Sequence, residues 1–205
     1  MISAKKIYLA SRSPRRRELL AQISVGFDLL LLRDDTTRGM DVDETPLPGE
    51  SPHDYVMRVS YAKAEGGLQR VQQRRLPVFP ILAADTAVVL DGKIMGKPAD
   101  RDAAIEMLLS LSGRRHEVFT AVTVANSVKI EQKVSVTIVQ FGKLTDQLAR
   151  HYAMTGEPFD KAGAYAIQGH AAAFIEKIEG SYSGVMGLPL FETAELLASF
   201  GIEVL

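Results

Sequence analysis

Cysteine is absent from the sequence, and its absence excludes disulfide bonds and zinc sites that use thiolate ligands. It also excludes the class of small secreted proteins that depend on disulfide bonds. An excess of charge is equally missing, because 24 basic residues stand against 25 acidic residues. With a net charge of −1 and a pI near 6.4, the chain is poorly suited to non-specific nucleic-acid binding, so any basic site must be local.

Long apolar segments are missing too. No apolar run approaches the ~20 residues of a membrane-spanning helix, and the first residues are not followed by the apolar stretch of a signal peptide. We therefore expect a cytoplasmic protein with no membrane partner and no stable nucleic-acid partner. The length of 205 residues is enough for a single domain with a substantial core, with one lobe or two.

The residue patterns of metalloproteins and serine hydrolases are also lacking. The four histidines do not have the spacing of metal ligands, and we expect them to be core or surface residues. Ser11 and Ser13 have no visible histidine and aspartate partners, which disfavours a serine hydrolase.

A basic motif, Ser-Arg-Ser-Pro-Arg-Arg-Arg, occupies residues 11–17. The apolar run at residues 7–10 predicts a buried strand before it, and residues 14–22 predict a helix. Ser13 suits the N-cap of this helix and Pro14 suits its first position. The three arginines would then lie in the first turn, where the helix dipole disfavours each cation by roughly 0.3–1 kcal/mol.

A bound anion would remove this conflict between the arginines and the helix dipole. Free backbone amides at the helix start, the hydroxyls of Ser11 and Ser13, and Arg15 or Arg16 could together hold a phosphate. The alternative is a solvated basic turn that tolerates a small penalty.

Apolar runs and turn signals predict the remaining elements of an α/β fold. Strands are predicted at residues 25–32, 81–90, 117–125, 128–141 and 174–179, with a hairpin turn at Asp91-Gly92. Helices are predicted from Ser51 to an end marked by Gly66-Gly67 and the polar run to Arg75, from Asp100 or Asp102 to Gly113, over 145–154 and over 191–200. Residues 33–50, 156–169 and 180–189 are predicted to be loops.

Asp85 and Thr86 interrupt an apolar strand of the kind that is buried on both faces. A carboxylate at such a position must be paired, protonated or bound to a metal. A structural ion pair or a hydrogen-bonded core aspartate is one explanation. We favour a functional role, because the core gains little from two adjacent polar residues.

Two lysines could face the same site. Lys63 continues the apolar stripe formed by Val56 and Val59, so its ammonium either reaches into a cleft or extends along the edge of the core to water. Lys97 follows the predicted hairpin, which could return it towards Asp85 and Thr86, although it could also be an exposed loop lysine.

Two loops carry further polar residues. Residues 41–44, Asp-Val-Asp-Glu, place three carboxylates within four residues, which suits a hard cation such as Mg²⁺ or a solvated acidic loop. Residues 156–169 are rich in turn formers but contain Asp160, Lys161, Tyr165 and Gln168. A cleft lining explains so many polar groups better than a packed structural loop does.

Taken together, these segments resemble the Maf family of nucleoside triphosphate pyrophosphatases. The resemblance lies in residues 10–16 (ASRSPRR), 41–44 (DVDE), 84–86 (ADT), 97–98 (KP), 157–165 (EPFDKAGAY), 167–169 (IQG) and 185–190 (VMGLPL). These motifs occur in the same order over almost the whole chain, which makes the resemblance much more specific than any one of them.

The resemblance implies a long mixed twisted sheet flanked by helices, with two lobes around a deep cleft in a single domain over residues 1–205. It implies hydrolysis of a nucleoside triphosphate to the monophosphate and pyrophosphate, with Mg²⁺ or Mn²⁺ as cofactor. Homodimers are usual among proteins of this kind.

The resemblance also assigns roles to individual residues. Asp85 matches the proton acceptor, and Glu44 with Asp85 matches the metal site. Positions that handle phosphates and metal are matched by Ser11, Arg15, Arg16, Glu44, Lys63 and Lys97. Arg15, Thr86 and Gln168 match positions that select the base, and their combination is similar to the branch that prefers dTTP and UTP. The amide of Gln168 can donate and accept hydrogen bonds, as a uracil or thymine edge requires.

Some residues depart from the family pattern. The chain is longer than expected between Phe27 and Asp41, and His170-Ala171 and Gly184 replace other residues near the predicted base pocket. Two alternatives therefore stay open. One is a pyrophosphatase for modified purine nucleotides such as 7-methyl-GTP, and the other is a non-catalytic nucleotide-binding regulator of cell division.

Overall fold

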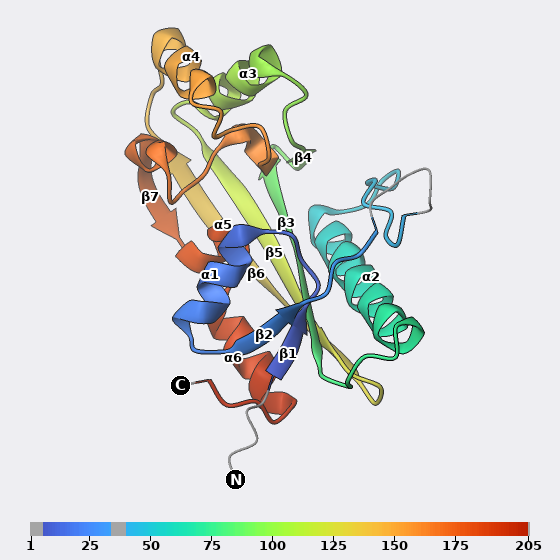
Figure 1. Ribbon diagram of the computed structural model, residues 1–205. Coiled ribbons are helices and arrows are strands. Elements are labelled where there is room, and N and C mark those ends of the chain that lie inside the picture. Colours follow the sequence, from blue (N-terminus) through green and yellow to red (C-terminus); the bar gives the residue numbers. More distant parts are fainter. Residues whose placement is uncertain (1–5, 34–39, 205) are drawn as a thin grey trace.

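The computed structural model describes residues 6–33 and 40–204, and within these residues the chain forms one mixed sheet flanked by helices (Figure 1). The expectation of a mixed α/β fold is therefore confirmed. The described strands number seven and follow the order β2-β1-β3-β5-β6-β7, with β4 pairing with β3. Their bounds are β1 Lys6–Leu9, β2 Gly26–Leu29, β3 Ile81–Leu90, β4 Lys93–Met95, β5 Arg115–Ala125, β6 Ile130–Phe141 and β7 Ile175–Glu179.

The direction of the strands changes at β3. Strands β2, β1 and β3 run parallel, whereas β4, β5, β6 and β7 continue in antiparallel pairs. The three long strands β3, β5 and β6 cross the whole molecule (Figure 1). Because these strands are shared, both ends of the molecule belong to the same sheet.

Helices cover the two ends of the sheet differently. Figure 1 shows α2 (Pro52–Gln73) on one face of the β1 end, with α1 (Pro14–Gln22) and α6 (Leu190–Ser199) on the other side. Helices α3 (Arg101–Leu111) and α4 (Asp146–Met154) lie at the opposite end, near β7. Of the four apolar clusters in the described core, one at the α3 end is built around Leu108 and Phe141, and one at the β1 end around Leu9, Leu20 and Leu197.

One edge of β3 is open at its centre. On this edge β1 pairs with Ile81 and Leu82, and β4 pairs with residues from Val88 onward. The intervening residues pair only with β5 on the other edge. Asp85 and Thr86 lie in this gap, beside the carboxyl end of β1, where open α/β sheets commonly bind ligands.

The predicted helix starts are largely confirmed. The side chains of Ser51, Asp100 and Thr145 each accept a hydrogen bond from a backbone N–H of the first turn. Ser13 occupies the N-cap of α1 with Pro14 after it, but its side chain makes no capping bond. The hydroxyl of Ser11 instead accepts a hydrogen bond from the N–H of Ser13 (3.1 Å).

The helix predicted to end over Gly66-Gly67 and the polar run to Arg75 ends at Gln73, within that run, so the two glycines do not end α2. A Cβ on Gly67 would lie 2.9 Å from Cγ2 of Ile81, so a glycine is needed where the helix packs tightly against β3. The loop predicted at 180–189 also contains a short helix, α5 (Tyr182–Met186). A 3₁₀ turn at Ala162–Ala164 and another at His170–Phe174 precede β7.

Some expectations fall outside the described residues. One concerns the first five residues of the chain. The other concerns residues 34–39 of the predicted loop, which include part of the extra length between Phe27 and Asp41. None of the helices in the described parts of the chain has the length and apolar character needed to cross a bilayer.

Candidate active site

A cavity of about 700 Å³ lies at the open edge of β3, between the two ends of the molecule. All of the residues to which the family resemblance assigns a role line it, namely Ser11, Arg15, Arg16, Glu44, Lys63, Asp85, Thr86, Lys97 and Gln168. They come from α1, α2, β3 and four connecting segments. The structure therefore brings these residues together, and their individual roles stay predictions.

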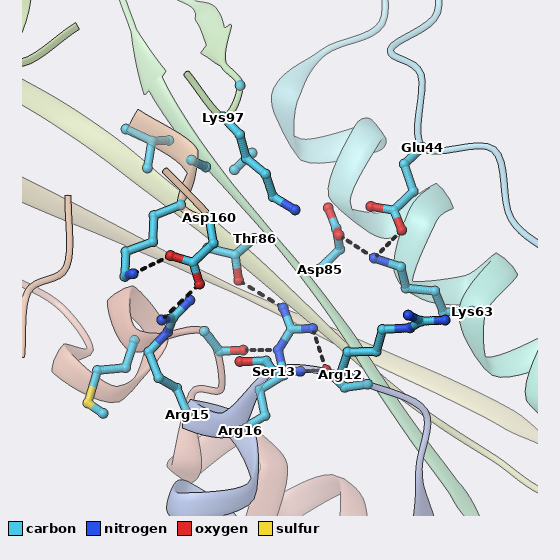
Figure 2. Close-up of a pocket in the computed structure, with 18 of the residues that line it drawn as sticks. Arg12, Ser13, Arg15, Arg16, Glu44, Lys63, Asp85, Thr86, Lys97 and Asp160 are labelled. Atoms are coloured by element: carbon cyan, nitrogen blue, oxygen red, sulfur yellow. Dashed lines mark hydrogen bonds and ion pairs between the residues drawn. The ribbon is translucent and has the colours of Figure 1, made fainter. Parts of the chain in front are cut away.

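The side chains of Asp85 and Thr86 lie on two different sides of the cavity. Successive residues of a strand point to opposite faces, so Asp85 faces Lys63 of α2 while Thr86 faces Arg16 of α1 (Figure 2). The open edge of β3 lets both side chains reach the same cavity. Lys97 also points into this space (Figure 2), as expected if the hairpin returns it towards Asp85.

Lys63 joins the two carboxylates on one side. Its Nζ lies 2.8 Å from Oδ1 of Asp85 and 3.0 Å from Oε1 of Glu44. The ammonium therefore reaches into the cleft and does not extend to bulk water. An aspartate in this strand was explained either by a structural ion pair or by a functional role. The pairing with Lys63 agrees with both explanations, because an ion pair inside a cavity can also be functional.

Asp85 is 6% exposed, and its carboxylate is only partly satisfied. Burial raises the pKa of Asp85, and the neighbouring charges of Lys63 and Arg16 oppose this increase only in part. Its Oδ2 atom is buried and accepts no hydrogen bond from the described residues. A carboxylate with a raised pKa and a free oxygen is suited to accept a proton or bind a cation.

Arg16 is partly buried on the other side of the cavity. Its Nε donates to the carbonyl of Gly187 (2.7 Å), and its Nη atoms donate to Ser11 and Thr86 (3.3 Å each). Burial lowers the pKa of Arg16, but a guanidinium stays charged because its ordinary pKa is so high. These bonds use three of its five N–H groups, which leaves two for an anion.

The three carboxylates of the acidic segment at residues 41–44 have different surroundings. Asp41 accepts hydrogen bonds from Arg70 and Arg33, which hold its pKa well below its usual range. Asp43 accepts a hydrogen bond from the backbone N–H of Thr45 (2.8 Å). Only Glu44 enters the cavity, so the segment is not the three-carboxylate cation site that its composition suggests.

Two residues of α2 hold the backbone around Glu44. The hydroxyl of Tyr55 donates to the carbonyl of Glu44 (3.0 Å). Arg58 donates to the carbonyls of Asp43 (3.2 Å) and Thr45 (3.0 Å). Sequence reasoning missed both residues, and the only signal was an arginine between the apolar positions Val56 and Val59.

Arg58 is itself fixed by a bidentate bond. Its Nε and Nη2 atoms lie 2.6 and 2.8 Å from the two carboxylate oxygens of Glu50. Glu50 also accepts a hydrogen bond from the backbone N–H of Leu47 (3.0 Å). Segment 43–50 is therefore tied to α2 on both sides of Glu44.

The turn-rich segment at 156–169 lines the cavity as expected, through Asp160, Lys161, Tyr165 and Gln168. A buried network supports it, in which the hydroxyl of Tyr152 donates to Glu157 (2.7 Å) and accepts from the N–H of Ala166 (3.1 Å). The segment thus has a fixed shape despite its many turn formers.

The residues present fit a divalent metal. Glu44 and Asp85 supply carboxylate oxygens, which Mg²⁺ and Mn²⁺ prefer, and Oδ2 of Asp85 has no hydrogen bond among the described residues. Within residues 6–33 and 40–204, no group of three or more histidine, aspartate or glutamate side chains is arranged around a metal position. A Mg²⁺ ion commonly takes one or two carboxylates and completes its shell with water and substrate phosphates.

Comparison with known proteins gives the same family as the motifs. The profile of the family described as Maf-like protein matches residues 6–200. A dTTP/UTP pyrophosphatase of Nitrosomonas europaea is 56% identical over 97% of this chain and 96% of its own length. One of Aromatoleum aromaticum is 55% identical over 96% of each chain, and one of Dechloromonas aromatica is 50% identical over 98% of this chain and all of its own.

A solved structure supports the fold. The Ham1 protein of Staphylococcus aureus superposes with a TM-score of 0.50 over 96% of this chain and 97% of its own, at 15% identity. At this level of identity the likeness concerns the fold alone.

Proposed function

This chain belongs to the Maf family, and on that basis we propose that it hydrolyses dTTP and UTP to the nucleoside monophosphate and pyrophosphate. Relatives with at least 50% identity over nearly their full length carry this activity in their names. The observation that carries the proposal is that Arg15, Arg16, Lys63 and Lys97 line the same cavity as Asp85. A triphosphate has the charge to match these four cations from separate segments.

The reaction requires a water molecule in line with the bond between the α-phosphorus and the oxygen that bridges to the β-phosphate. The water oxygen forms a bond to the α-phosphorus, the bridging bond breaks, and pyrophosphate leaves. Asp85 orients this water and accepts its proton, for which its raised pKa and free Oδ2 atom are suited.

Cations stabilise the charge that develops on the leaving group. Lys97 and Arg15 face the cavity from opposite ends of the molecule, while Lys63 holds Asp85 in place. Glu44 and Asp85 are the residues that would hold Mg²⁺ or Mn²⁺. When bound, such a metal acts as a Lewis acid and lowers the pKa of a bound water.

The base preference has a chemical counterpart in the cavity. Gln168 lines it on the segment that follows the 3₁₀ turn at Ala162–Ala164. Its amide offers a donor and an acceptor side by side, which matches a carbonyl beside an N–H on uracil or thymine.

Product analysis tests the reaction. Purified protein incubated with dTTP and Mg²⁺ should release dTMP and pyrophosphate in equal amounts. Release of dTDP and free phosphate would show that another bond is cut. If nucleotide binds but no product forms, the protein is a nucleotide-binding regulator and the proposed function is wrong.

Competition between nucleotides tests the base preference. With dTTP, UTP, CTP, GTP and 7-methyl-GTP at equal concentrations, dTTP and UTP should be consumed first. Preferential loss of GTP or 7-methyl-GTP would favour the purine alternative.

A further inference from the structure

A carboxylate is held between two cations at one side of the cavity. Oδ2 of Asp160 lies 3.8 Å from Nη1 of Arg15, and Oδ1 of Asp160 accepts a hydrogen bond from Lys161 (Figure 2). All three residues line the cavity. Arg15 comes from α1 and the other two from the segment before the 3₁₀ turn, so the trio joins the two ends of the molecule.

The three side chains differ in exposure. The Lys161 side chain is 12% exposed, and its Nζ also donates to the carbonyl of Glu157 (2.7 Å). The Arg15 side chain is 21% exposed, whereas that of Asp160 is 64% exposed. The two cations are therefore held in place, and the carboxylate between them is accessible to a ligand.

Asp160 is ionised under ordinary conditions. Burial is the largest single influence and raises its pKa, but the hydrogen bond from Lys161 and the charges of Lys161 and Arg15 together outweigh it and leave the pKa below its usual value. An ionised carboxylate only accepts hydrogen bonds, whereas a guanidinium and an ammonium only donate them. The order along the cavity wall is therefore donor, acceptor, donor.

This order is complementary to one kind of base. The pairing edge of uracil and of thymine presents a carbonyl, the N3–H group and a second carbonyl, which is acceptor, donor, acceptor. We propose that Asp160 accepts the N3–H of the substrate base while Arg15 and Lys161 donate to its carbonyls. The inference deepens the proposed function, on which it rests, by naming two specificity residues beyond the predicted Arg15, Thr86 and Gln168.

The proposed contacts predict acceptance of UTP and dTTP and rejection of CTP. Uracil and thymine have the same pairing edge, and neither the thymine methyl group nor the sugar 2′-hydroxyl belongs to it. Cytosine presents an amino group in place of one carbonyl and an unprotonated N3 in place of N3–H. The amino group would face a cation and N3 would face the Asp160 carboxylate, and such mismatches are an effective way to exclude a competitor.

A methyl group on N3 of the substrate tests the contact directly. We expect the wild-type protein to use 3-methyl-UTP at least roughly tenfold less efficiently than UTP, judged by kcat/KM, because one charge-assisted hydrogen bond is lost. In Asp160→Ala the same methyl group should cost less than about threefold, since the partner of N3–H is already gone. The UTP rate of this variant should fall mainly through KM.

A second variant tests the choice between UTP and CTP. Asp160→Asn keeps the size of the side chain but adds a donor, so the preference for UTP over CTP should fall roughly tenfold or more. Asp91→Asn is the matched control, because Asp91 is an exposed carboxylate paired with Arg114 outside the cavity. It should keep the wild-type preference for UTP and the wild-type cost of the methyl group.

The outcomes separate this inference from the proposed function. If the wild type hydrolyses dTTP and UTP but the methyl group costs the same in Asp160→Ala, another residue such as Gln168 reads N3–H and the inference is wrong. If the wild type releases no pyrophosphate from either nucleotide, the proposed function fails and the inference fails with it.

Discussion

Asp85 combines a buried position with a carboxylate oxygen that the described part of the protein leaves free. Such an arrangement costs stability, because a buried carboxylate needs partners for both oxygens. It lies in the middle of β3, beside Lys63, and lines the cavity. This burial with one oxygen unbonded is what the role proposed for Asp85 requires.

Replacing Asp85 with asparagine should remove the proton acceptor and preserve the shape of the side chain. We expect kcat for dTTP to fall by about 10²–10⁴-fold, the usual contribution of a general base. Binding of a non-hydrolysable α,β-methylene analogue of dTTP, measured by calorimetry, should change little. Asp91→Asn serves as the exposed control, and an Asp85→Asn enzyme with wild-type kcat would refute the assignment.

The burial of His116, behind the cavity-lining residue Tyr165, predicts that the stability of the protein depends on pH. It is 2% exposed and bonded through Nε2 to the hydroxyl of Tyr165 (2.8 Å). Burial lowers its pKa to about 4 from an ordinary value of 6.5. Between these values the unfolded chain binds a proton at His116 that the folded protein does not bind, so the free energy of unfolding falls as the pH is lowered.

The loss should reach about 3 kcal/mol near pH 4 if His116 acts alone. In His116→Gln, which keeps a hydrogen-bonding group but does not titrate there, the free energy of unfolding should depend less on pH between 6.5 and 4. Urea unfolding at several pH values measures this. His53→Gln is the control at an exposed histidine, and identical slopes in all three proteins would contradict the prediction.

Individual site residues were predictable where the chemistry is unusual for its position. An aspartate in an apolar strand and arginines in the first turn of a helix are both conspicuous, and the structure places Asp85, Arg15 and Arg16 in the cavity. Arg58 was not predictable, because its contacts depend on how segment 43–50 folds back on α2. No spacing rule connects an arginine to carbonyls 13 and 15 residues away.

At the level of elements, the pair Gly66-Gly67 shows how tertiary packing overrides a local signal. Two adjacent glycines predict a helix end, yet α2 runs through them to Gln73. The contacts with Ile81 and Leu30 explain why Gly67 lacks a side chain. Propensity is a weak guide wherever a helix backbone must approach a strand this closely.

The two glycines should respond in opposite ways to alanine. A Cβ on Gly66 would be 3.7 Å from its nearest neighbour, an ordinary contact, so Gly66→Ala should stabilise the protein by about 0.5–1 kcal/mol through helix propensity. A Cβ on Gly67 would lie 2.9 Å from Ile81, so Gly67→Ala should destabilise it by about 1–3 kcal/mol. Urea unfolding measures both, and equal effects would refute the packing explanation.

The connection between segment 43–50 and α2 predicts a coupled loss of activity. Arg58→Met removes the bonds to Glu50 and to the carbonyls beside Glu44, so kcat/KM for dTTP should fall about tenfold. Combining it with Glu44→Gln should cost little more than Glu44→Gln alone, because both act through the same carboxylate. Arg150→Met, which breaks an exposed pair on α4, is the control, and fully multiplicative losses would show that Arg58 acts independently.

Across the whole molecule, two of the apolar clusters, one at each end, draw residues from the same long strands. Val88 and Val118 belong to the cluster around Leu108, while Leu82 and Val122 belong to the cluster around Leu20. Because β3 and β5 supply both, the two ends of the molecule should be stable or unstable together. If the chain is a single domain with two lobes, as expected from the sequence, its two lobes should unfold together.

Unfolding experiments test this expectation. Leu108→Ala and Leu20→Ala each remove a fully buried side chain and should destabilise by about 2–5 kcal/mol. In both variants, urea unfolding followed by far-UV circular dichroism and by tyrosine fluorescence should give one coincident transition. Two separated transitions in either variant would show that the lobes fold as separate units.

The sequence allowed the fold class and most strands to be predicted, since apolar runs are local signals. It did not reveal the strand order, because which strand neighbours β3 depends on long-range pairing. Nor could it show that β3 lacks a partner between Leu82 and Val88 on one edge. That gap creates the cavity, so the location of the site follows from topology more than from any motif.

The unbroken passage of β3, β5 and β6 from one end of the molecule to the other also limits how the protein can move. A hinge needs a few residues that can change their backbone angles freely, and paired strands offer none. We therefore expect no hinge opening between the two halves of the molecule. Substrate entry and product release would then depend on movements of side chains at the edge of the cavity. Arg15 and Asp160 face each other there from opposite halves of the molecule.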